Sequence, residues 1–432
     1  MGKILIVDVT TRTVEFVTRD EPYYKKYLGG SFLAAKLFDE QVGNKRDLSP
    51  FAPNNPLVFA PGVLAGKAVC GATRVNLFSM SPETPGVFLS QAGGEFGPNI
   101  KRAGFDALVI KGKSDKPTVI TISNDNVGFE DGESFWGMDR VEVYTKLKEK
   151  LGPKTAIASI GIAGENKVCN ANIMFEPDHY AGRGGMGAVL GAKNIKAICI
   201  NGDQKPTFAD EEQVKTINKT GSKAFKTAFE NFPNDFLGVL RNYGTWGLLQ
   251  LNQIIGNIPV KNFNETFLTD EASAQEISHD NGQTKYVGKR VPCKGCYVAC
   301  KKSSKLENQT ALPEYESLSL LGPNLGISNA INMIEACELC NHLGVDTMSI
   351  GNMLGFVMDC SEHGLLPTKD LDFSLHYGDT KGTLELINDI VFQKGPIGEL
   401  LAKGVESLCE RIGESSRQYL RFSKGVGIPA HL

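Results

Sequence analysis

The sequence lacks a long apolar run, an excess of positive charge and an internal repeat. No stretch of its 432 residues is long enough to span a membrane, and the N-terminal MGKILIVDVTTRTVEF alternates like a strand instead of forming the apolar region of a secretion signal. A formal net charge of −3 and a pI near 6.1, with scattered Lys and Arg, argue against nucleic acid as a partner. The missing repeat argues against a solenoid. We therefore expect a cytoplasmic protein with no membrane span.

The pattern of apolar residues divides the chain into two expected domains. Residues 1–205 are strand-rich and begin with a hairpin pattern, ILIVDVT then TVEFVT, around the polar turn at 10–13; helices are expected at 24–41 and 141–150. Residues 206–432 show helical periodicity instead. We predict an α+β fold, in which an N-terminal mixed α/β domain is followed by a mostly α-helical domain.

The helical half contains one irregular segment. Helices are expected at 314–321, 330–342 and 349–363, and a last helical stretch ends at the glycine C-cap Gly413. Residues 259–309 are polar and irregular and contain three closely spaced cysteines. We expect this cysteine motif on a loop between helices.

The three cysteines are Cys293, Cys296 and Cys300, with the spacing C-x2-C-x3-C, whereas the other seven of the ten lie in apolar or helical sequence. Thiolates this close can bind three corners of an iron–sulfur cubane. Zinc is the main alternative, but no second CxxC or His pair follows, and unpaired structural cysteines fit a polar loop poorly. A fourth ligand is missing nearby. Cys337 or Cys340 could supply it, although packing in a helical core suits them better.

Three glycine-rich turns occur in the strand-rich half, at residues 27–31, 90–97 and 181–187. Glycine lets backbone amides approach an anion closely, and Arg74 and Arg183 lie beside these turns, where guanidinium groups could bind phosphate. None of the turns is a dinucleotide fingerprint or a P-loop. Structural turns and surface ion pairs remain alternatives for these residues.

Several motifs together resemble the tungsten-dependent aldehyde:ferredoxin oxidoreductase family. They occur in the family's order along the whole chain: YLGG at 27–30, TRVN at 73–76, AGGEFGPNIKRAGFDALVIKGK at 92–113, AGRGGMGAVLGAKNIKAI at 181–198, CKGCYVAC at 293–300, PEYE at 313–316 and NHLGVDT at 341–347.

The resemblance implies that the sheets of the first domain form a base for two pterins that hold tungsten or molybdenum, with a magnesium ion between the pterin phosphates as an option. It implies a 4Fe-4S cluster on the three cysteines. The residues it assigns to the pterin cofactor are Arg74, Gln91, Gly93, Tyr180, Ala181, Gly182, Asn341, Val345 and Asp346. Gln91, Tyr180, Asn341 and Val345 depart from the family's usual residues, and the helix with Glu335 and Glu338 lacks the histidine that binds a bridging iron in some relatives.

The activity implied is oxidation of a small aldehyde to a carboxylic acid, with electrons passing through the cluster to ferredoxin or a ferredoxin-like subunit. The resemblance sets Glu316 close to the metal, so Glu316 is the expected base for the attacking water, whose proton a carboxylate with a raised pKa can take. A charge at the N-terminus of a helix is the alternative for both Glu314 and Glu316. Family members continue for a further domain, so a C-terminal companion chain is expected to complete the site, and a homo-oligomer is expected as well. The alternatives are a low-potential reductase subunit acting on an aromatic thioester, and a non-catalytic electron-transfer subunit or fragment.

Overall fold

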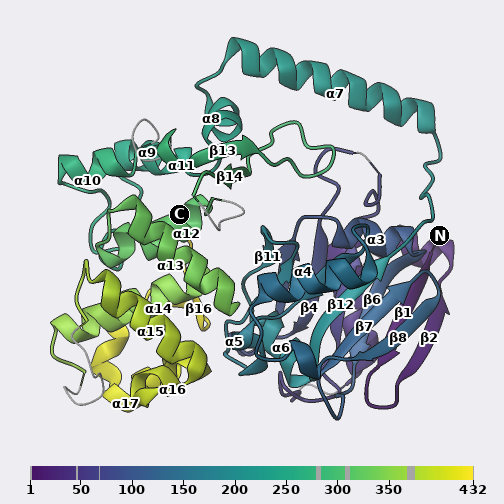
Figure 1. The fold of residues 1–432 in the computed structure, drawn as a ribbon, viewed down its shortest axis with the longest axis horizontal. Coiled ribbons are helices and arrows are strands. Elements are labelled where there is room, and N and C mark those ends of the chain that lie inside the picture. The colour runs from purple at the N-terminus through teal and green to yellow at the C-terminus, as the bar shows by residue number, and fades with distance from the viewer. Residues whose placement is uncertain are drawn as a thin grey trace. The chain divides into compact units, whose positions relative to one another are not determined.

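The computed structural model describes residues 2–44, 47–67, 69–278, 284–306, 312–366 and 375–431. The chain divides into two compact units (Figure 1). The first unit comprises Met1–Thr220 and Cys293–Cys296, and the second comprises Gly221–Pro292 and Tyr297–Leu432. Within the described ranges, no helix has the length and apolar character needed to cross a membrane.

The first unit contains two six-stranded mixed sheets. One has the order β2-β1-β6-β3-β4-β5, from β1 (Lys3–Asp8), β2 (Thr13–Thr18), β3 (Leu57–Pro61), β4 (Val75–Met80), β5 (Val87–Ala92) and β6 (Phe105–Lys111). The other has the order β11-β10-β9-β12-β7-β8, from β7 (Thr118–Ser123), β8 (Asn126–Asp131), β9 (Ala156–Ser159), β10 (Ile173–Phe175), β11 (His179–Ala181) and β12 (Ile195–Asn201). The hairpin predicted at the N-terminus is confirmed, since β1 and β2 pair antiparallel from Lys3↔Thr18 to Asp8↔Thr13.

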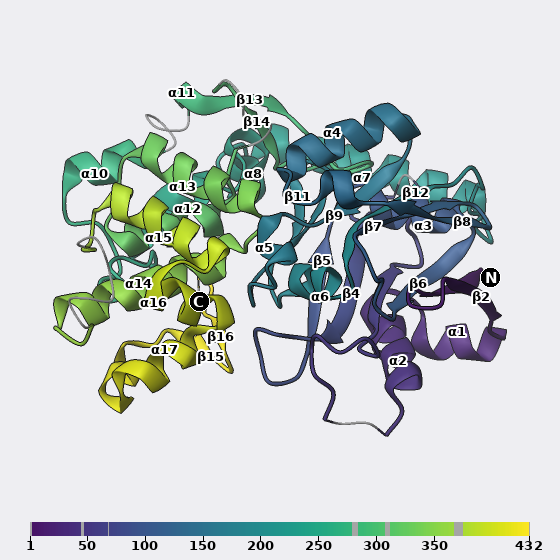
Figure 2. The ribbon, with the colours of Figure 1, turned by 60° about the horizontal axis from the view of Figure 1, so that its bottom comes forward.

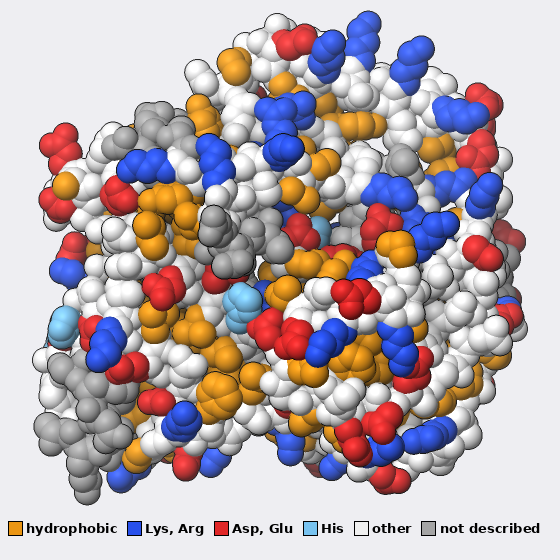
Figure 3. Space-filling view, in the orientation of Figure 1, with side chains coloured by type: hydrophobic (Ala, Val, Ile, Leu, Met, Phe, Trp, Pro, Cys, Tyr) orange, Lys and Arg blue, Asp and Glu red, His pale blue; other side chains and the backbone are white. Residues whose placement is uncertain are grey.

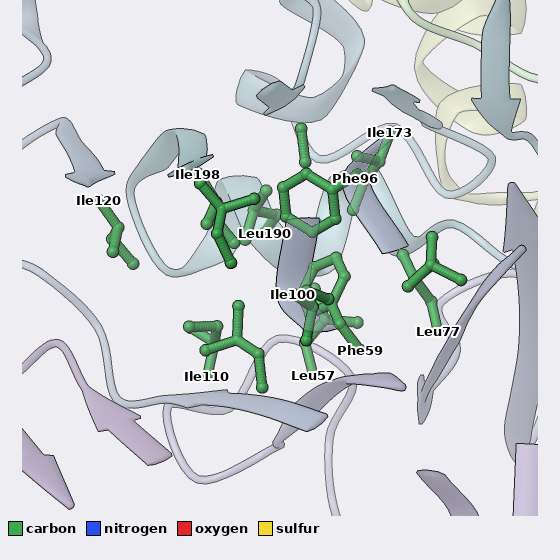
Figure 4. Close-up of a cluster of buried hydrophobic side chains, with 14 of the residues drawn as sticks. Leu57, Phe59, Leu77, Phe96, Ile100, Ile110, Ile120, Ile173, Leu190 and Ile198 are labelled. Atoms are coloured by element: carbon green, nitrogen blue, oxygen red, sulfur yellow. The ribbon is translucent and has the colours of Figure 1, made fainter. Parts of the chain in front are cut away.

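One buried apolar cluster joins the two sheets (Figure 4). Alternate residues of each strand point to one face, so Leu5 and Val7 enter this cluster from the first sheet, and Ile198 and Ile200 enter it from the second. Two short helices, α3 (Phe96–Arg102) and α6 (Met186–Ala192), add Phe96, Leu190 and other side chains to the same cluster. This core fixes the strand ends and turns from which the candidate site is built.

Helices cover the other faces of the sheets (Figure 2). Leu33 and Leu37 of α2 (Gly30–Val42) pack on the first sheet, and Val143 and Leu147 of α4 (Arg140–Leu151) pack on the second. The helix predicted at 141–150 is thus confirmed. The single helix predicted at 24–41 is wrong: α1 (Glu21–Tyr27) ends at Leu28, whose φ of 53° is incompatible with a right-handed helix, and α2 begins after Gly29. The unit also contains η1 (Glu133–Phe135) and α5 (Ile162–Glu165).

The helix α7 (Glu211–Asn231) begins in the first unit and ends in the second, which is otherwise mainly helical. Its helices are α8 (Phe236–Tyr243), α9 (Gly247–Ile255), α10 (Glu271–Glu276), α11 (Thr284–Tyr286), α12 (Tyr315–Leu321), η3 (Pro323–Leu325), α13 (Ala330–Leu343), α14 (Thr347–Glu362), α15 (Thr380–Phe392), α16 (Gly395–Lys403), α17 (Val405–Ile412) and η4 (Glu414–Tyr419). Two hairpins accompany them, β13 (Val287–Arg290) with β14 (Lys302–Ser304) and β15 (Phe422–Ser423) with β16 (Val426–Gly427).

Polar side chains set where several of these helices begin. Asp235, Asn329, Asp346 and Asp379 each precede a helix and accept a hydrogen bond from the backbone N–H three residues later. The helices predicted at 314–321, 330–342 and 349–363 are confirmed with shifts of one or two residues. The mixed α/β part followed by a helical part confirms the predicted α+β fold. The expected setting of the cysteine motif is wrong, because its loop joins the strands β13 and β14 and not two helices.

Candidate functional site

An exposed guanidinium lines a cavity of the first unit. Arg74, the residue before β4, borders a cavity of about 270 Å³ together with Asn76, the turn at 62–65 and the turn at 70–72. The YLGG turn lies against the same residues: a Cβ on Gly29 would be 3.1 Å from the carbonyl oxygen of Pro61, and one on Gly30 would be 3.0 Å from Asn76 Nδ2. Glycine is therefore needed where this turn meets the cavity lining.

Gln91 lies opposite Asn76 in the β4–β5 register, and Asn76 follows Arg74 by two residues. Its Nε2 donates to Asn76 Oδ1 at 2.9 Å, and Asn76 Nδ2 donates to the carbonyl oxygen of Ala60 at 3.3 Å. These contacts hold the buried Asn76 amide in one orientation and leave the exposed Gln91 at the edge of the sheet.

The residues expected near the cofactor on β11 lie beside the glycine turn that follows β5. A Cβ on Gly93 would be 2.7 Å from His179 Cδ2, and one on Gly94, whose φ is 87°, would be 2.0 Å from Glu176 Oε2. Tyr180 follows His179 in β11 and donates its hydroxyl to the carbonyl oxygen of Pro177 at 2.6 Å. Ala181, at the end of β11, is fully buried, and Gly182 follows it. The first unit thus brings the 90–97 and 181–187 turns together.

One cysteine of the motif lies at this place. His179 Nε2 is 3.4 Å from Cys293 Sγ, and His179 Nδ1 is 2.8 Å from Asp178 Oδ1. All three residues belong to the first unit. The sequence reasoning missed Asp178 and His179. The signal that could have found them is the Asp-His pair, which only Tyr180 separates from the AGRGG segment.

Glu176 is a second residue that the sequence reasoning missed. It has a left-handed φ of 57°, and its Oε2 accepts the backbone N–H of Glu95 at 3.1 Å. Burial raises the pKa of Glu176 to about 7, although the Glu95 N–H, His179 and Lys148 oppose the shift. Its Oε1 is buried and has no hydrogen-bond partner within the described part of the chain. A carboxyl with this pKa can exchange a proton near neutral pH.

Two cations hold the remainder of the cysteine loop within the second unit. The buried Lys302 ammonium donates to the carbonyl oxygens of Ala299 and Cys300 at 2.9 and 3.0 Å, and Arg241 Nη1 donates to that of Tyr297 at 2.5 Å. Burial lowers the pKa of Lys302 to about 8. These contacts fix the backbone around Cys300, where Ala299 adopts a left-handed φ of 55°.

The three cysteines of the motif form no disulfide among the described residues and are distributed over both units. Cys293 and Cys296 belong to the first unit and Cys300 to the second. In the ranges that the structure describes, no three His, Cys, Asp or Glu side chains are arranged to hold a metal ion. Cys337 and Cys340 are fully buried on α13, and burial raises the pKa of both thiols. They lie in the core of the second unit, as the packing interpretation requires.

Glu316 lies on α12 in contact with residues far along the chain. Its Oε2 accepts the backbone N–H of Ala430 at 2.7 Å, and its Oε1 contacts His431 Nδ1. The ring of His431 also lies 5.5 Å from that of Tyr315. The sequence reasoning missed His431, for which no local motif gives a signal.

The NHLGVDT segment is linked to α12 by a hydrogen bond of 2.7 Å between Ser317 Oγ and Thr347 Oγ1. Asp346 is buried and accepts hydrogen bonds from the backbone N–H and the hydroxyl of Ser349, so it caps α14. Val345 is fully buried, and Asn341 is half-buried on α13. The second unit therefore brings Glu316 and the 341–347 segment onto neighbouring helices.

In the first unit, an anionic cofactor fits better in the cavity beside Arg74, against which the YLGG turn lies, than at the turn that begins with Ala181. Arg74 offers an exposed guanidinium beside a cavity, and added Cβ atoms at Gly62 and Gly71 would meet open space. At Gly185 and Gly187, in contrast, a Cβ would lie 2.0 and 2.2 Å from the carbonyl oxygens of Cys169 and Asn172. Those two glycines serve close packing of the protein on itself.

Comparison with known proteins agrees with this combination of motifs. Two family models match, "Aldehyde ferredoxin oxidoreductase, N-terminal domain" over residues 4–202 and "Aldehyde ferredoxin oxidoreductase, domains 2 & 3" over residues 222–432. The chain is 34% identical to the tungsten-containing aldehyde ferredoxin oxidoreductase of Pyrococcus abyssi, covering 100% of this chain and 70% of the relative. It is 33% identical to the aliphatic sulfonate oxidoreductase, WOR-like subunit, of Pyrococcus furiosus, and the match covers 100% of this chain and 71% of that relative.

A solved structure shares the fold. The active site complex BamBC of benzoyl coenzyme A reductase, in complex with 1,5-dienoyl-CoA, contains a chain that superposes with a TM-score of 0.89 and 25% sequence identity, covering 100% of this chain and 66% of that one. Together with the family models and the relatives, this similarity identifies the chain as an oxidoreductase of a tungsten enzyme family. The chain belongs to the aldehyde ferredoxin oxidoreductase family.

Proposed function

We propose that this chain forms the cofactor-binding part of an enzyme that oxidises small aldehydes to carboxylic acids with water and passes the electrons to ferredoxin. One observation supports this most strongly. Cys293 Sγ lies 3.4 Å from His179, whose ring is against Gly93, so the first motif cysteine and the glycine-rich turn at 90–97 meet within one unit. An enzyme that moves electrons from a pterin-bound metal to an iron–sulfur cluster requires these two motifs to be adjacent.

The cofactors proposed are tungsten or molybdenum on two pterin dithiolenes and a 4Fe-4S cluster, which together accept two electrons from the substrate and release them singly. Arg74 would bind anionic groups of the pterins, and Gln91, Gly93, Tyr180, Ala181 and Gly182 would line the same side of the cofactor. Asn341, Val345 and Asp346 are proposed as further cofactor-binding residues. Cys293, Cys296 and Cys300 would bind the cluster, and a magnesium ion could neutralise the pterin phosphates.

Glu316 is proposed as the group that takes the proton of the attacking water. Aldehyde and water give a carboxylate, two electrons and protons, so a nearby base assists the reaction. The Glu316 carboxylate is mostly shielded from solvent, with 21% of its side chain exposed, and it is oriented by the Ala430 N–H and by His431. His431 is 58% exposed at the side chain and can pass a proton from Glu316 towards solvent.

The test is metal analysis and turnover of the protein purified without oxygen. We expect iron together with tungsten or molybdenum, and aldehyde-dependent reduction of the dye benzyl viologen. Glu316→Gln should lose most of this turnover and keep its metals, while the control Glu335→Gln, on an exposed position of α13, should keep both. Full turnover of a fully loaded Glu316→Gln protein would contradict the role of Glu316, and iron without tungsten or molybdenum would favour a non-catalytic electron-transfer subunit.

The similarity to the benzoyl coenzyme A reductase complex supports a second candidate function, a low-potential reductase that acts on an aromatic thioester with partner subunits. The two functions use the same motifs and differ in substrate. An assay of reduced-dye oxidation with benzoyl-CoA, run beside the aldehyde assay on the same preparation, distinguishes them. Activity with benzoyl-CoA and none with aldehydes would replace the first proposal by the second.

A further inference from the structure

The segment that carries the cysteines is strongly cationic, unlike the chain as a whole. Residues 284–306 contain no Asp or Glu, although the whole chain has a net charge of −3. The seven cations of this segment are Lys285, Lys289, Arg290, Lys294, Lys301, Lys302 and Lys305. Lys and Arg are therefore clustered around the cysteine motif, so the scattered distribution inferred for the whole chain does not hold for this segment.

The cations differ in what they do. Lys302 is buried and holds the loop carbonyls, and Lys301 lies 3.4 Å from Glu314 in an ion pair. Lys285, Lys289, Arg290 and Lys305 are exposed, and all four belong to the second unit. Figure 3 shows Lys and Arg side chains gathered over α8 and the β13–β14 hairpin. This exposed set produces a positive field at the surface.

An apolar corner is attached to the cationic hairpin. Phe232 and Phe236, at the turn between α7 and α8, are 61% and 57% exposed. Arg290 Nη2 donates to Asn242 Oδ1 at 3.3 Å, and Asn242 Nδ2 donates to the carbonyl oxygen of Pro233 at 3.3 Å, within this corner. Protein interfaces are enriched in aromatic residues and Arg and have a polar rim, and this surface has both features.

The chain itself keeps this surface close to the cysteines. Arg290 precedes Cys293 by three residues, and Lys305 follows Cys300 by five, so at most about 11 Å and about 18 Å of extended chain separate these pairs. A redox protein bound at the hairpin would thus lie near any cluster held by the cysteine motif.

We propose that Lys285, Lys289, Arg290 and Lys305, with Phe232 and Phe236, form a docking surface for an acidic one-electron carrier protein of the ferredoxin type. This inference rests on the proposed function. The positive field attracts a carrier with a negative surface and speeds association, and the exposed aromatics supply the small apolar contact of a transient redox encounter. Each oxidised carrier would accept one electron at this surface, so the two electrons released by one aldehyde would require two encounters.

The test compares two electron acceptors on the cofactor-loaded full chain, with aldehyde as the donor. The double variant Lys289→Glu/Lys305→Glu should lower kcat/KM for an acidic ferredoxin by about tenfold or more at low salt, because electrostatic steering changes association rates by that order. Its rate with benzyl viologen should remain unchanged, since a small dye needs no docking surface. In 1 M salt the difference should shrink, because the screening length falls to about 3 Å.

The matched control is Lys113→Glu/Lys154→Glu, which makes the same change of charge at two exposed positions of the first unit. It should react with ferredoxin like the unmodified protein. Phe236→Ser should weaken ferredoxin reduction in both low and high salt, because it removes an apolar contact. Equal loss in the control, or ferredoxin reduction by Lys289→Glu/Lys305→Glu at the unmodified rate in low salt, would overturn the docking surface.

The outcomes also separate this inference from the proposed function. Absence of dye reduction by the unmodified, metal-loaded protein refutes the proposed function, whereas normal dye reduction with unaltered ferredoxin kinetics refutes only the docking surface. Sedimentation analysis of the same variants adds a readout without turnover. Dissociation of an oligomer by Lys289→Glu/Lys305→Glu would assign the surface to a second copy of this chain and overturn the inference.

Discussion

The glycine-rich turns of the first unit and the cysteine hairpin of the second are built in opposite ways. At Gly185, and at Gly187 and Gly191 in the helix α6 that follows it, an added Cβ would lie 2.0, 2.2 and 1.9 Å from a backbone carbonyl oxygen, so this turn and helix are fixed by close steric contact. The hairpin is fixed by long cationic side chains such as Lys302 and Arg241, which reach loop carbonyls. Substitutions in the first region should therefore act on stability, and those in the second on local geometry, charge and redox properties.

The largest effect is expected at Gly191. In Gly191→Ala the new methyl group, on α6, would overlap the carbonyl oxygen of Gly164, on α5. The two helices would therefore have to move apart. We expect a loss of about 3 kcal/mol or more in the free energy of unfolding, measured by urea denaturation. The control is Gly86→Ala, where a Cβ meets nothing within 4 Å. Equal stability of the two variants would contradict steric control of this region.

A second prediction concerns the buried carboxyl of Glu176. Its pKa of about 7 in the folded protein is above the ordinary value of 4.5, so the folded state binds more protons than the unfolded state between these pH values. The unmodified protein therefore loses free energy of unfolding as the pH rises from the ordinary pKa of 4.5 through about 7. The glutamine side chain of the Glu176→Gln variant does not titrate. The free energy of unfolding of this variant, relative to that of the unmodified protein, should therefore rise by up to about 3 kcal/mol from pH 5 to pH 8. A difference that stays constant with pH would contradict the raised pKa.

The sequence predicted features that depend on short segments. The N-terminal hairpin, the helices α12, α13 and α14 and the C-cap at Gly413 all follow from local periodicity, turn residues and capping. The motif residues of the first unit were also identified individually. Local pattern is sufficient for these features because each is decided by residues within about ten positions of one another.

Features that depend on distant residues were missed. His179 and Cys293 are 114 positions apart, and so are Glu316 and Ala430, yet each pair is in contact. Such contacts result from packing of whole sheets and helices, which periodicity does not encode. The break at Leu28 was missed because apolar periodicity continues across it. The strands β13 and β14 were missed because they are short and their sequences, VGKR and KSS, are largely polar.

A smaller effect is expected at Lys302, on the hairpin side of the comparison. Lys302→Met keeps the length of the side chain and leaves the carbonyl oxygens of Ala299 and Cys300 without their donor. An unsatisfied buried acceptor costs about 1–3 kcal/mol, so the urea midpoint should fall and the iron content should decrease. The control Lys289→Met changes an exposed lysine of the same hairpin and should alter neither. Retained iron and stability in Lys302→Met would show that the loop is held by other contacts.

The smallest effect on stability, with a distinct redox signature, is expected at His179, which contacts the part of the cysteine loop that belongs to the first unit. A cluster-bound Cys293 is a thiolate, which accepts hydrogen bonds, and an N–H of His179 donated to it stabilises the more negative, reduced cluster. Loss of this donor in His179→Ala should lower the cluster reduction potential by on the order of 60 mV, a factor of ten in a one-electron equilibrium. Redox titration followed by electron paramagnetic resonance measures the potential, with His376→Ala, an exposed histidine, as the control. An unchanged potential at full iron content would mean that the 3.4 Å contact is only packing, and that the glycine-rich region influences the hairpin through its shape alone.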